Sequence, residues 1–479
     1  MPDIEHSIRS TNYGVECCSQ TARSKASAVA SNRSVASGER EQSDTMLLAS
    51  AGKPILHSRS PEIFNAAFSH LGLDARYVRL AASDANDLVQ AAREMGLRAF
   101  NITSPFKESI IPLLDSVDEH ARKIGAVNTV IVENGEMLGH NTDYIGVQDA
   151  LAKDVGNLKG KKAVVLGAGG AARAAAYALV SAKARTTVAN RTPEKAREIA
   201  DSFGCAWAGL DDIGELLNDA DILVSCLPIA EPVVPASSLR KGLIVMDAHY
   251  GTQTALQKDA KKKGCKMVDG REWLLYQAVP RFEYITGKAP PLDEMRKALY
   301  AKSRPQKPNI ALIGFMGAGK STVGKMLAHE LGMEFLDTDS LIESRAGASV
   351  QEIFKKRGVS EFRKLEKDIA IGEISQSENK VFSCGGGIII DEENRKAIEG
   401  SSIVVWLWVS PEVAVQRIGE GTRPLLDGAE DRLDAAKKLI AWRLGLYAQA
   451  SDLVINAGNK PPQEVAERII YEINQTFGH

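Results

Sequence analysis

Short apolar runs rich in β-branched residues alternate along most of the chain with longer runs rich in Ala and Leu. In the first half, four of the short runs lie at residues 162–166, 186–189, 222–226 and 243–246. A helix-like stretch follows each of them, which is the βαβ pattern of a parallel sheet. The same alternation starts again at Ile310 and continues to the end of the sequence. The pattern predicts two α/β modules.

Two segments interrupt this alternation. Residues 1–45 contain nine serines and few large apolar side chains, too few to bury a core, so we predict a flexible tail there. Residues 301–309 contain two prolines and several polar or basic side chains, which predicts a linker. We therefore place the first module at residues 46–303 and the second at residues 304–479, each with a core and a site of its own.

The composition narrows the class of protein. Of the 479 residues, 44% are hydrophobic and 25% are charged, which excludes collagen, a coiled coil and wholesale disorder. Lys and Arg number 59 against 61 Asp and Glu, so a net charge of −2 provides no basic surface for nucleic acid or a membrane. The most apolar-looking stretch, residues 163–182, lacks the density of Leu, Ile and Phe that a membrane span has. We expect small-molecule partners, and the oligomeric state stays open.

Cysteine and histidine spacing bears on metals and compartment. The six cysteines form no C-x-x-C pair and the eight histidines show no H-x-x-x-H spacing, which argues against a zinc site or a disulfide framework. Reduced thiols favour a cytoplasmic protein. The tail leaves a plastid or another organelle open, because Arg and Ser are frequent there as in transit peptides. Glu39, Glu41 and Asp44 argue against that alternative.

The second module opens with a phosphate-binding motif. Residues 314–321 match G-x-x-x-x-G-K-[ST] between a strand-like and a helix-like run. Backbone N–H groups of such a loop converge on phosphate oxygens, Lys320 would contact the β- and γ-phosphates, and Ser321 would bind Mg²⁺. The alternative is a glycine-rich turn without a ligand. The candidate ATP-binding residues are Gly314, Gly317, Ala318, Gly319, Lys320, Ser321 and Thr322.

Further motifs follow in a fixed order, and together they resemble the shikimate kinases from residue 310 to residue 478. They are Asp337 and Asp339 in Phe-Leu-Asp-Thr-Asp, Arg363 and Glu366, the triple glycine Gly385, Gly386 and Gly387, Arg423 in Gly-Thr-Arg-Pro-Leu-Leu, and Arg443 in Arg-Leu-Gly-Leu-Tyr. The resemblance implies a P-loop kinase fold of the nucleoside-monophosphate-kinase type.

The resemblance to shikimate kinases also implies roles for these residues. Arg363 and Arg443 would bind the substrate carboxylate, and Asp339 would bind the ring hydroxyls close to Gly385–Gly387. Asp337 would bind Mg²⁺ with Ser321, Arg417 would lie over adenine, and Lys320 and Arg423 would stabilise the transferring phosphoryl group. Two structural alternatives stay open. Arg363 and Glu366 could form only a surface ion pair, and Asp339 could be the N-cap of a helix beginning near Ser340.

The first module contains a dinucleotide-binding pattern. Residues 164–172 comprise a strand, G-x-G-x-x-A and the start of an Ala-rich helix. A second strand ends at Asn190, and Arg191 follows where an NAD site usually has an acid, so NADP(H) is favoured. The candidate cofactor-binding residues are Gly167, Ala168, Gly169, Gly170, Ala171, Asn190, Arg191 and Thr192.

Six motifs around this pattern resemble shikimate dehydrogenase over residues 47–299. They contain Ser58 and Ser60, Thr103 and Lys107, Asn128, Asp143, Tyr250, and Gln277. The resemblance implies a substrate-binding part at about residues 46–150 and 271–300, and a Rossmann-like NADP-binding part at about residues 151–270.

The resemblance to shikimate dehydrogenase assigns the chemistry as well. Lys107 and Asp143 would be the catalytic pair. Ser58, Ser60, Thr103 and Tyr250 would bind the carboxylate, and Asn128 and Gln277 the hydroxyls. The structural alternatives are that Ser60 is an N-cap with Pro61 at the first helical position, and that residues 141–143 form only a turn.

The two resemblances together predict a bifunctional enzyme of aromatic amino-acid biosynthesis. It would reduce 3-dehydroshikimate to shikimate with NADPH and phosphorylate shikimate to shikimate 3-phosphate with MgATP. One alternative is a first module that acts on quinate, against which Ser58, Ser60 and Arg191 argue. Another is a non-catalytic sensor of pathway intermediates, against which Lys107, Asp143, Lys320 and Asp339 argue.

Overall fold

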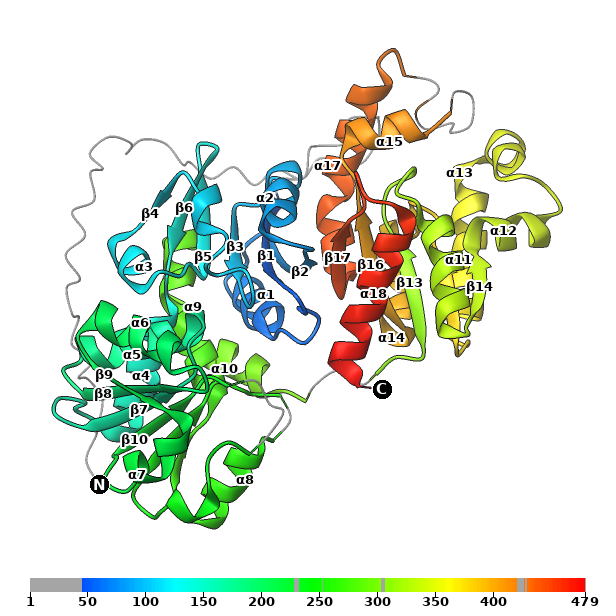
Figure 1. Ribbon diagram of the computed structural model, residues 1–479. Coiled ribbons are helices and arrows are strands. Elements are labelled where there is room, and N and C mark those ends of the chain that lie inside the picture. Colours follow the sequence, from blue (N-terminus) through cyan, green and yellow to red (C-terminus); the bar gives the residue numbers. More distant parts are fainter. Residues whose placement is uncertain are drawn as a thin grey trace, which may run out of the picture. The chain divides into compact units, whose positions relative to one another are not determined.

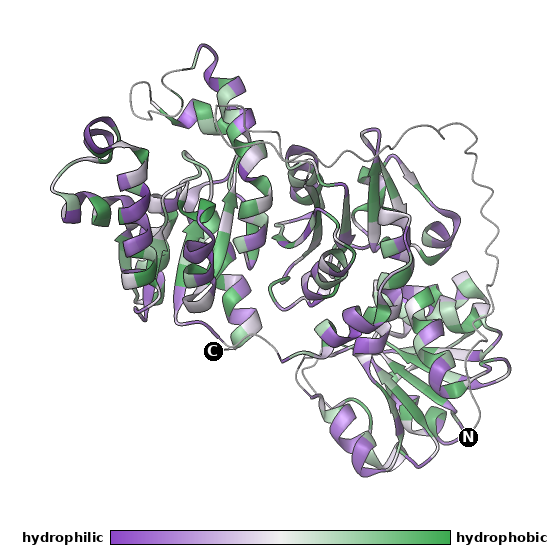
Figure 2. Ribbon diagram, turned by 180° about the vertical axis from the view of Figure 1, so that it is seen from behind, coloured by the Kyte–Doolittle hydropathy of each residue, from purple (hydrophilic) through white to green (hydrophobic). Residues whose placement is uncertain are grey.

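The computed structural model of the chain describes residues 45–227, 232–251, 253–302, 306–419, 426 and 429–478. Apart from Thr45, the predicted tail lies outside the described residues, and so do the predicted boundary at residues 303–304 and Arg423. The described residues form two sheets covered by helices (Figure 1). Their strands are mostly apolar, whereas the helices combine polar and apolar residues (Figure 2). Among the described residues no helix combines the length and the apolar composition needed to cross a bilayer.

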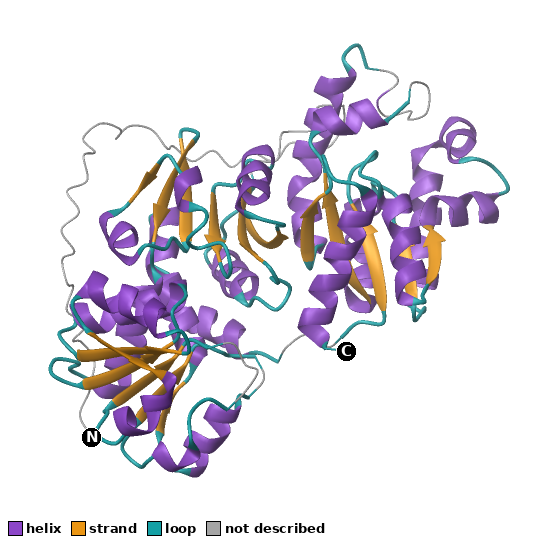
Figure 3. Ribbon diagram, in the orientation of Figure 1, coloured by secondary structure: helices purple, strands orange, loops and turns teal. Residues whose placement is uncertain are grey.

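Six parallel strands make up one sheet. Their spatial order is β12 (Lys266–Val268), β11 (Ile244–Asp247), β10 (Ile222–Ser225), β7 (Lys162–Leu166), β8 (Arg185–Asn190) and β9 (Ala206–Gly209). Both faces are covered by α4 (Asp143–Val155), α5 (Gly170–Ser181), α6 (Pro193–Phe203), α7 (Ile213–Leu217) and α8 (Ala255–Lys262) (Figure 3). The chain crosses over on either side of β7, which is the topology of a dinucleotide-binding fold. The predicted Rossmann-like architecture is confirmed.

Six strands of the first module form one part of the second sheet. Their order is β2 (Ala75–Ala81), β1 (Met46–Gly52), β3 (Ala99–Ile102), β5 (Thr129–Glu133), β6 (Glu136–His140) and β4 (Ser116–Val117). The helices of this part are α1 (Ser60–His70), α2 (Ala85–Glu94), α3 (Glu119–Ile124), α9 (Gly270–Thr286) and α10 (Leu292–Tyr300). Phe282 on α9 packs on Phe64 and Phe68 of α1, with ring centroids 6.1 and 5.7 Å away. These ring contacts hold the late helix α9 against the early part of the chain.

The second module contributes five parallel strands, in the order β14 (Glu334–Asp337), β15 (Lys380–Ser383), β13 (Asn309–Ile313), β16 (Ser402–Trp408) and β17 (Leu453–Asn456). Its helices are α11 (Lys320–Leu331), α12 (Thr338–Ala346), α13 (Val350–Ile369), α14 (Glu392–Ser401), α15 (Pro411–Arg417), α17 (Arg432–Ala450) and α18 (Pro462–Phe477). All residues of β13 and β16 are buried, as expected for central strands covered on both faces. The P-loop therefore starts from the middle of the sheet.

The two modules join along strand edges. In β17, Val454 pairs with Leu80 of β2 and Ile455 pairs with Ala81, in parallel orientation. The eleven strands thus form one sheet, and one hydrophobic cluster contains buried residues of both modules. Three further clusters of the described residues belong to the first module alone. The prediction that each module has a core of its own is therefore wrong in part, because the buried side chains beside β2 and β17 are continuous.

We expect the ring cluster on α9 to stabilise the first module strongly. Phe282 is fully buried, so Phe282→Ala should lower the free energy of unfolding by about 3–5 kcal/mol. Tyr284→Ala is the matched control on the same helix, because Tyr284 is 51% exposed and its loss should cost less than about 1 kcal/mol. Urea unfolding of both variants measures the difference, and equal effects would contradict the packing described.

Candidate active sites

The first candidate site contains a buried ion pair. Lys107 follows β3 and Asp143 is the first residue of α4; Lys107 Nζ lies 2.5 Å from Asp143 Oδ2. The side chain of Asp143 is 3% exposed and that of Lys107 is 16% exposed. Asn141 Oδ1 accepts a hydrogen bond from the backbone N–H of Asp143, and Trp273 Nε1 donates to its carbonyl oxygen. These contacts fix an amine beside a carboxylate, the arrangement of a held proton donor.

Beside this ion pair lies a buried network of amides and hydroxyls. Asn128 Nδ2 donates to Gln277 Oε1 and to Thr142 Oγ1, at 3.1 Å in both cases. Arg281, which is 1% exposed, donates to Thr129 Oγ1, Thr142 Oγ1 and Gln277 Oε1. Asn128 and Gln277 are thus brought together as predicted for two residues that bind hydroxyls. Arg281 was not predicted as a site residue, because a single arginine within a helix gives no local signal that it is buried.

The loop between β1 and α1 carries the two predicted serines. Ser58 and Ser60 are 3% and 4% exposed, and the Ser60 backbone N–H donates to Ser58 Oγ at 3.4 Å. Ser60 is not the N-cap of α1: Arg59 holds that position, and no side chain caps the helix. The capping alternative for Ser60 is therefore wrong. Burial raises the pKa of Tyr250 to about 12, opposed by a backbone hydrogen bond at Arg59, so its hydroxyl remains protonated next to this loop.

Thr103 lies opposite that loop, in the chain that leaves β3. Its backbone N–H donates to the Ala51 carbonyl at the end of β1, which holds the ends of β1 and β3 together. A Cβ built on Gly52 would lie 2.4 Å from Thr103 Oγ1, so the hydroxyl points at the start of the serine loop. The structure therefore gathers Ser58, Ser60, Thr103 and Tyr250 around one loop.

The dinucleotide turn lies directly beside the ion pair. Gly167 has φ +113°, and a Cβ there would lie 3.2 Å from the Cys226 carbonyl, so glycine is required. A Cβ on Gly170, at the start of α5, would lie 3.2 Å from Cβ and Cδ of Lys107. The turn of Gly167, Ala168, Gly169, Gly170 and Ala171 thus places a helix N-terminus against the ion pair of Lys107 and Asp143. Such a terminus favours anionic phosphate.

The neighbouring strand β8 ends at the predicted 2′-phosphate residues. Asn190 is its last residue and donates from Nδ2 to the Thr192 carbonyl, and Thr192 is the N-cap of α6. Arg191 between them is exposed. Because β8 pairs with β7 in parallel, Arg191 and the turn both lie at the carboxyl ends of the strands. An exposed guanidinium at this edge suits a phosphate on the adenosine ribose.

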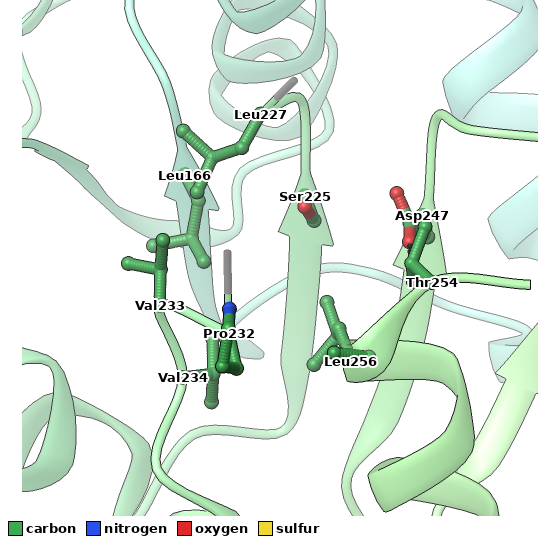
Figure 4. A pocket seen from close by; sticks show the side chains of 10 residues that line it. Leu166, Ser225, Leu227, Pro232, Val233, Val234, Asp247, Thr254 and Leu256 are labelled. Atoms are coloured by element: carbon green, nitrogen blue, oxygen red, sulfur yellow. Dashed lines mark hydrogen bonds between the residues drawn. The ribbon is translucent and has the colours of Figure 1, made fainter. Parts of the chain in front are cut away.

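A small cavity of about 30 Å³ lies at the carboxyl ends of β7, β10 and β11 (Figure 4). Its wall includes Leu166, Ser225 and Asp247, and Asp247 Oδ2 accepts a hydrogen bond from Thr254 Oγ1 at 2.7 Å. This volume holds about one water molecule, so we assign no substrate to it.

The P-loop of the second module has the geometry of a phosphate cradle. Gly314 has φ +143°, and a Cβ there would lie 2.4 Å from the Leu407 carbonyl oxygen. Lys320 Nζ donates to the carbonyls of Gly314 and Phe315 at 2.9 and 3.0 Å, which holds the amine over the loop. Ala318 and Gly319 complete the turn into α11, whose first three residues are Lys320, Ser321 and Thr322.

Hydroxyl and carboxylate oxygens meet at the end of this loop. Ser321 Oγ donates to Asp337 Oδ2 at 2.7 Å and lies 3.0 Å from Ser383 Oγ. This hard-oxygen donor set suits Mg²⁺. Among the described residues no three His, Cys, Asp or Glu side chains converge, so a cation here would take its remaining ligands from phosphate and water.

A second pocket lies directly against the P-loop. Its volume is about 280 Å³, and Gly317, Thr322, Arg417 and Lys460 contribute to its wall. Arg417 donates to the carbonyls of Gly317 at 3.4 Å and of Ala457 at 3.2 Å. Arg417 therefore lies in the wall of the pocket beside the P-loop. Its position over a nucleobase stays a prediction.

The predicted acceptor residues converge next to the triple glycine. A Cβ on Gly385 would lie 2.6 Å from Asp339 Oδ1, and a Cβ on Gly387 would lie 2.4 Å from Arg363 Nη2. The Gly386 carbonyl accepts hydrogen bonds from Arg443 Nη1 at 3.0 Å and from the Tyr447 hydroxyl at 2.6 Å. Arg443 is 1% exposed, although it faces a polar site.

Two structural alternatives for this pocket do not hold. Asp337 rather than Asp339 is the N-cap of α12, since Asp337 Oδ1 accepts from the N–H groups of Asp339 and Ser340. Arg363 pairs with Glu366, but Glu366 is 1% exposed, so the pair is not a surface pair. Burial raises the pKa of Glu366 to about 7, and Arg363 opposes this rise.

Comparisons with known proteins match both modules. Family models match at residues 51–130 (shikimate dehydrogenase substrate binding domain), 149–248 (shikimate/quinate 5-dehydrogenase) and 316–474 (shikimate kinase). The shikimate dehydrogenase (NADP(+)) of Pyrococcus abyssi is 38% identical over 251 residues, which are 51% of this chain and 94% of that protein.

Two solved structures add to this result. A shikimate dehydrogenase in complex with NADP⁺ has a TM-score of 0.52 and 36% identity, and the match covers 56% of this chain and 99% of that chain. Quinate dehydrogenase from Corynebacterium glutamicum in complex with NAD has a TM-score of 0.50 and 31% identity, covering 54% and 99%.

The close approach at Gly387 leads to a prediction for the acceptor pocket. Gly387→Ala should displace the Arg363 guanidinium and raise the KM of the kinase domain for its acceptor by about 10–100-fold. Gly400→Ala is the matched control, because nothing lies within 4 Å of a Cβ there. Steady-state kinetics of both variants decide the matter, and a normal acceptor KM for Gly387→Ala would refute the close packing.

The raised pKa of Glu366 should make the stability of the chain depend on pH. Its pKa is about 7 in the folded chain against a usual 4.5, so the folded state holds a proton that the unfolded state has lost. The stabilisation that this bound proton provides is complete below pH 4.5 and disappears as the pH rises through 7. The unfolding free energy of the wild type should fall relative to that of Glu366→Gln by on the order of 3 kcal/mol between pH 4.5 and pH 8. Urea unfolding across this range measures it, and parallel pH curves would contradict the raised pKa.

Proposed function

Because this chain belongs to the NADP-dependent shikimate dehydrogenase family and also contains a shikimate kinase domain, we propose that it catalyses two consecutive reactions. It reduces 3-dehydroshikimate to shikimate with NADPH, and it phosphorylates the 3-hydroxyl of shikimate with MgATP. The observation that supports this most is that both motif sets converge: the Lys107–Asp143 pair lies at the dinucleotide turn, and Asp339, Arg363 and Arg443 surround the triple glycine.

In the reduction, Lys107 provides the proton and Asp143 holds the amine in place. The turn of Gly167–Ala171 and Arg191 would hold NADPH, which would supply the hydride for the carbonyl carbon. Lys107 Nζ donates a proton to the carbonyl oxygen, so the ketone becomes an alcohol. Asn128 and Gln277 hold the other hydroxyls through the network that Arg281 supports, while Ser58, Ser60, Thr103 and Tyr250 bind the carboxylate. The surrounding burial excludes water from the Asp143 carboxylate and strengthens its attraction for the amine.

In the phosphorylation, the chain supplies cations on both sides of the transferred group. Arg363 and Arg443 bind the shikimate carboxylate, and Asp339 orients the attacking hydroxyl. Lys320 neutralises charge on the β- and γ-phosphates, while Ser321 and Asp337 hold Mg²⁺, which neutralises phosphate charge when bound. We also assign Arg423 to the transition state on the basis of its motif; it lies outside the described residues.

Quinate is a second candidate substrate of the dehydrogenase part, because a quinate dehydrogenase is among the structural relatives. Purified enzyme should be assayed for oxidation of shikimate and of quinate with NADP⁺ and with NAD⁺, and separately for phosphorylation of shikimate with MgATP. The proposal requires that kcat/KM for shikimate with NADP⁺ exceeds kcat/KM for quinate and for shikimate with NAD⁺. It also requires that shikimate is phosphorylated. Preference for quinate would assign the alternative, and absence of all turnover would favour a sensor.

Replacing the proton donor should separate the two activities. Lys107→Ala should lower dehydrogenase turnover by about 10²–10⁴-fold, because it removes the general acid, and should leave kinase turnover unchanged. Lys123→Ala is the control, because Lys123 is exposed and pairs with the exposed Glu119 across one helical turn. Equal loss of both activities in Lys107→Ala would show that the change acts through folding.

Arg191 should determine the choice between NADP⁺ and NAD⁺. In Arg191→Asp, the carboxylate repels a 2′-phosphate and accepts a hydrogen bond from a 2′-hydroxyl, so the preference should shift toward NAD⁺. The ratio of kcat/KM for the two cofactors measures the shift. An unchanged ratio would remove Arg191 from the cofactor site.

A further inference from the structure

A carboxylate of the kinase domain contacts the serine loop of the dehydrogenase part. Glu472 lies on α18 and is fully buried. Its Oε2 accepts hydrogen bonds from the backbone N–H groups of Ile55 and Leu56, at 2.7 and 3.0 Å. These two residues belong to the loop between β1 and α1, some 416 positions away in sequence. Among the described residues, the dehydrogenase part itself provides no acceptor for these two amides.

The contacted loop is the one that presents Ser58 and Ser60. The Ser58 backbone N–H donates to the Ile55 carbonyl at 2.9 Å. A displacement of Ile55 would therefore also displace Ser58. From the opposite side, Arg79 Nε donates to the Ser58 carbonyl at 2.9 Å, and Glu62 holds the Arg79 guanidinium. The loop is therefore held at both ends, by Arg79 of its own module and by Glu472 of the other.

Neighbouring contacts keep α18 in this position. Lys460, just before α18, lies 2.5 Å from Asp87 Oδ2 on α2, with side chains 16% and 9% exposed. The pairing of β17 with β2 lies beside these contacts. The shikimate dehydrogenase of Pyrococcus abyssi has 94% of its length aligned to 251 residues of this chain, too few to include a kinase domain as well. The carboxylate from α18 is thus an addition that comes with the second module.

We propose that Glu472 is a positioning residue for the dehydrogenase reaction, fixing from the kinase domain the backbone of the loop that presents Ser58 and Ser60. This inference rests on the proposed function in one respect, that these serines bind shikimate. Two amides that lose a buried acceptor must either remain unpaired or move, and either outcome disturbs the serines. Burial raises the pKa of Glu472, while the hydrogen bonds from Ile55 and Leu56 oppose that rise.

The test uses the full-length chain with Glu472→Gln and Glu472→Leu. Gln keeps one acceptor oxygen at the same length, whereas Leu keeps only the volume. Glu467→Gln is the matched control on the same helix, since Glu467 is exposed and accepts a hydrogen bond from Gln463 one turn away. Dehydrogenase kcat, the KM for shikimate and the KM for NADP⁺ are measured with the kinase constants, and hydrogen–deuterium exchange is followed at residues 54–60.

We expect the KM for shikimate to rise about tenfold in Glu472→Leu and less in Glu472→Gln. The KM for NADP⁺, the kinase constants and the Glu467→Gln control should stay within about twofold, and exchange at residues 54–60 should quicken in both Glu472 variants. An unchanged KM with unchanged exchange would overturn the proposal, and so would an equal loss of both activities. If the wild type does not oxidise shikimate, the proposed function fails, and exchange at the loop still decides whether Glu472 positions it.

Discussion

Two glycine turns, at Gly167 and Gly314, fix where both active sites lie. In each turn, the glycine follows a buried parallel strand and lies very close to a carbonyl of a neighbouring segment. A side chain at Gly167 would crowd the Cys226 carbonyl, and one at Gly314 would collide with the Leu407 carbonyl. The backbone can therefore turn at the strand end and start a helix whose N–H groups face outward. Lys107 lies against the first turn and Lys320 over the second, so the chemistry of each site is placed by these two turns.

Local sequence predicted the parts of the sites that lie within a few residues of each other. The turns, the P-loop lysine and the carboxylate at Asp337 follow from motifs whose spacing is tied to a strand or a helix start. The capping alternatives for Ser60 and Asp339 failed by one or two residues, because several polar residues compete at a helix start and the backbone decides among them. Arg281 was missed because its partners come from three separate segments of the chain.

The junction between the modules was beyond prediction for the same reason. The pairing of β17 with β2 joins segments about 370 residues apart. The residue pattern of neither strand indicates which other strand it pairs with. The pairing does have a physical rationale, because an uncovered strand edge exposes unpaired N–H and C=O groups. Joining β2 to β17 covers two such edges at once and brings α18 beside the serine loop.

We propose that one chain carries out both reactions in sequence, and a mass-spectrometric time course follows both products in one experiment. Purified full-length protein is incubated with 3-dehydroshikimate, NADPH and MgATP. We expect shikimate to form first and shikimate 3-phosphate to follow. Omitting ATP should stop the reaction at shikimate, and omitting NADPH should prevent both products. Failure to form shikimate with NADPH, or failure to phosphorylate added shikimate with MgATP, would contradict this proposal.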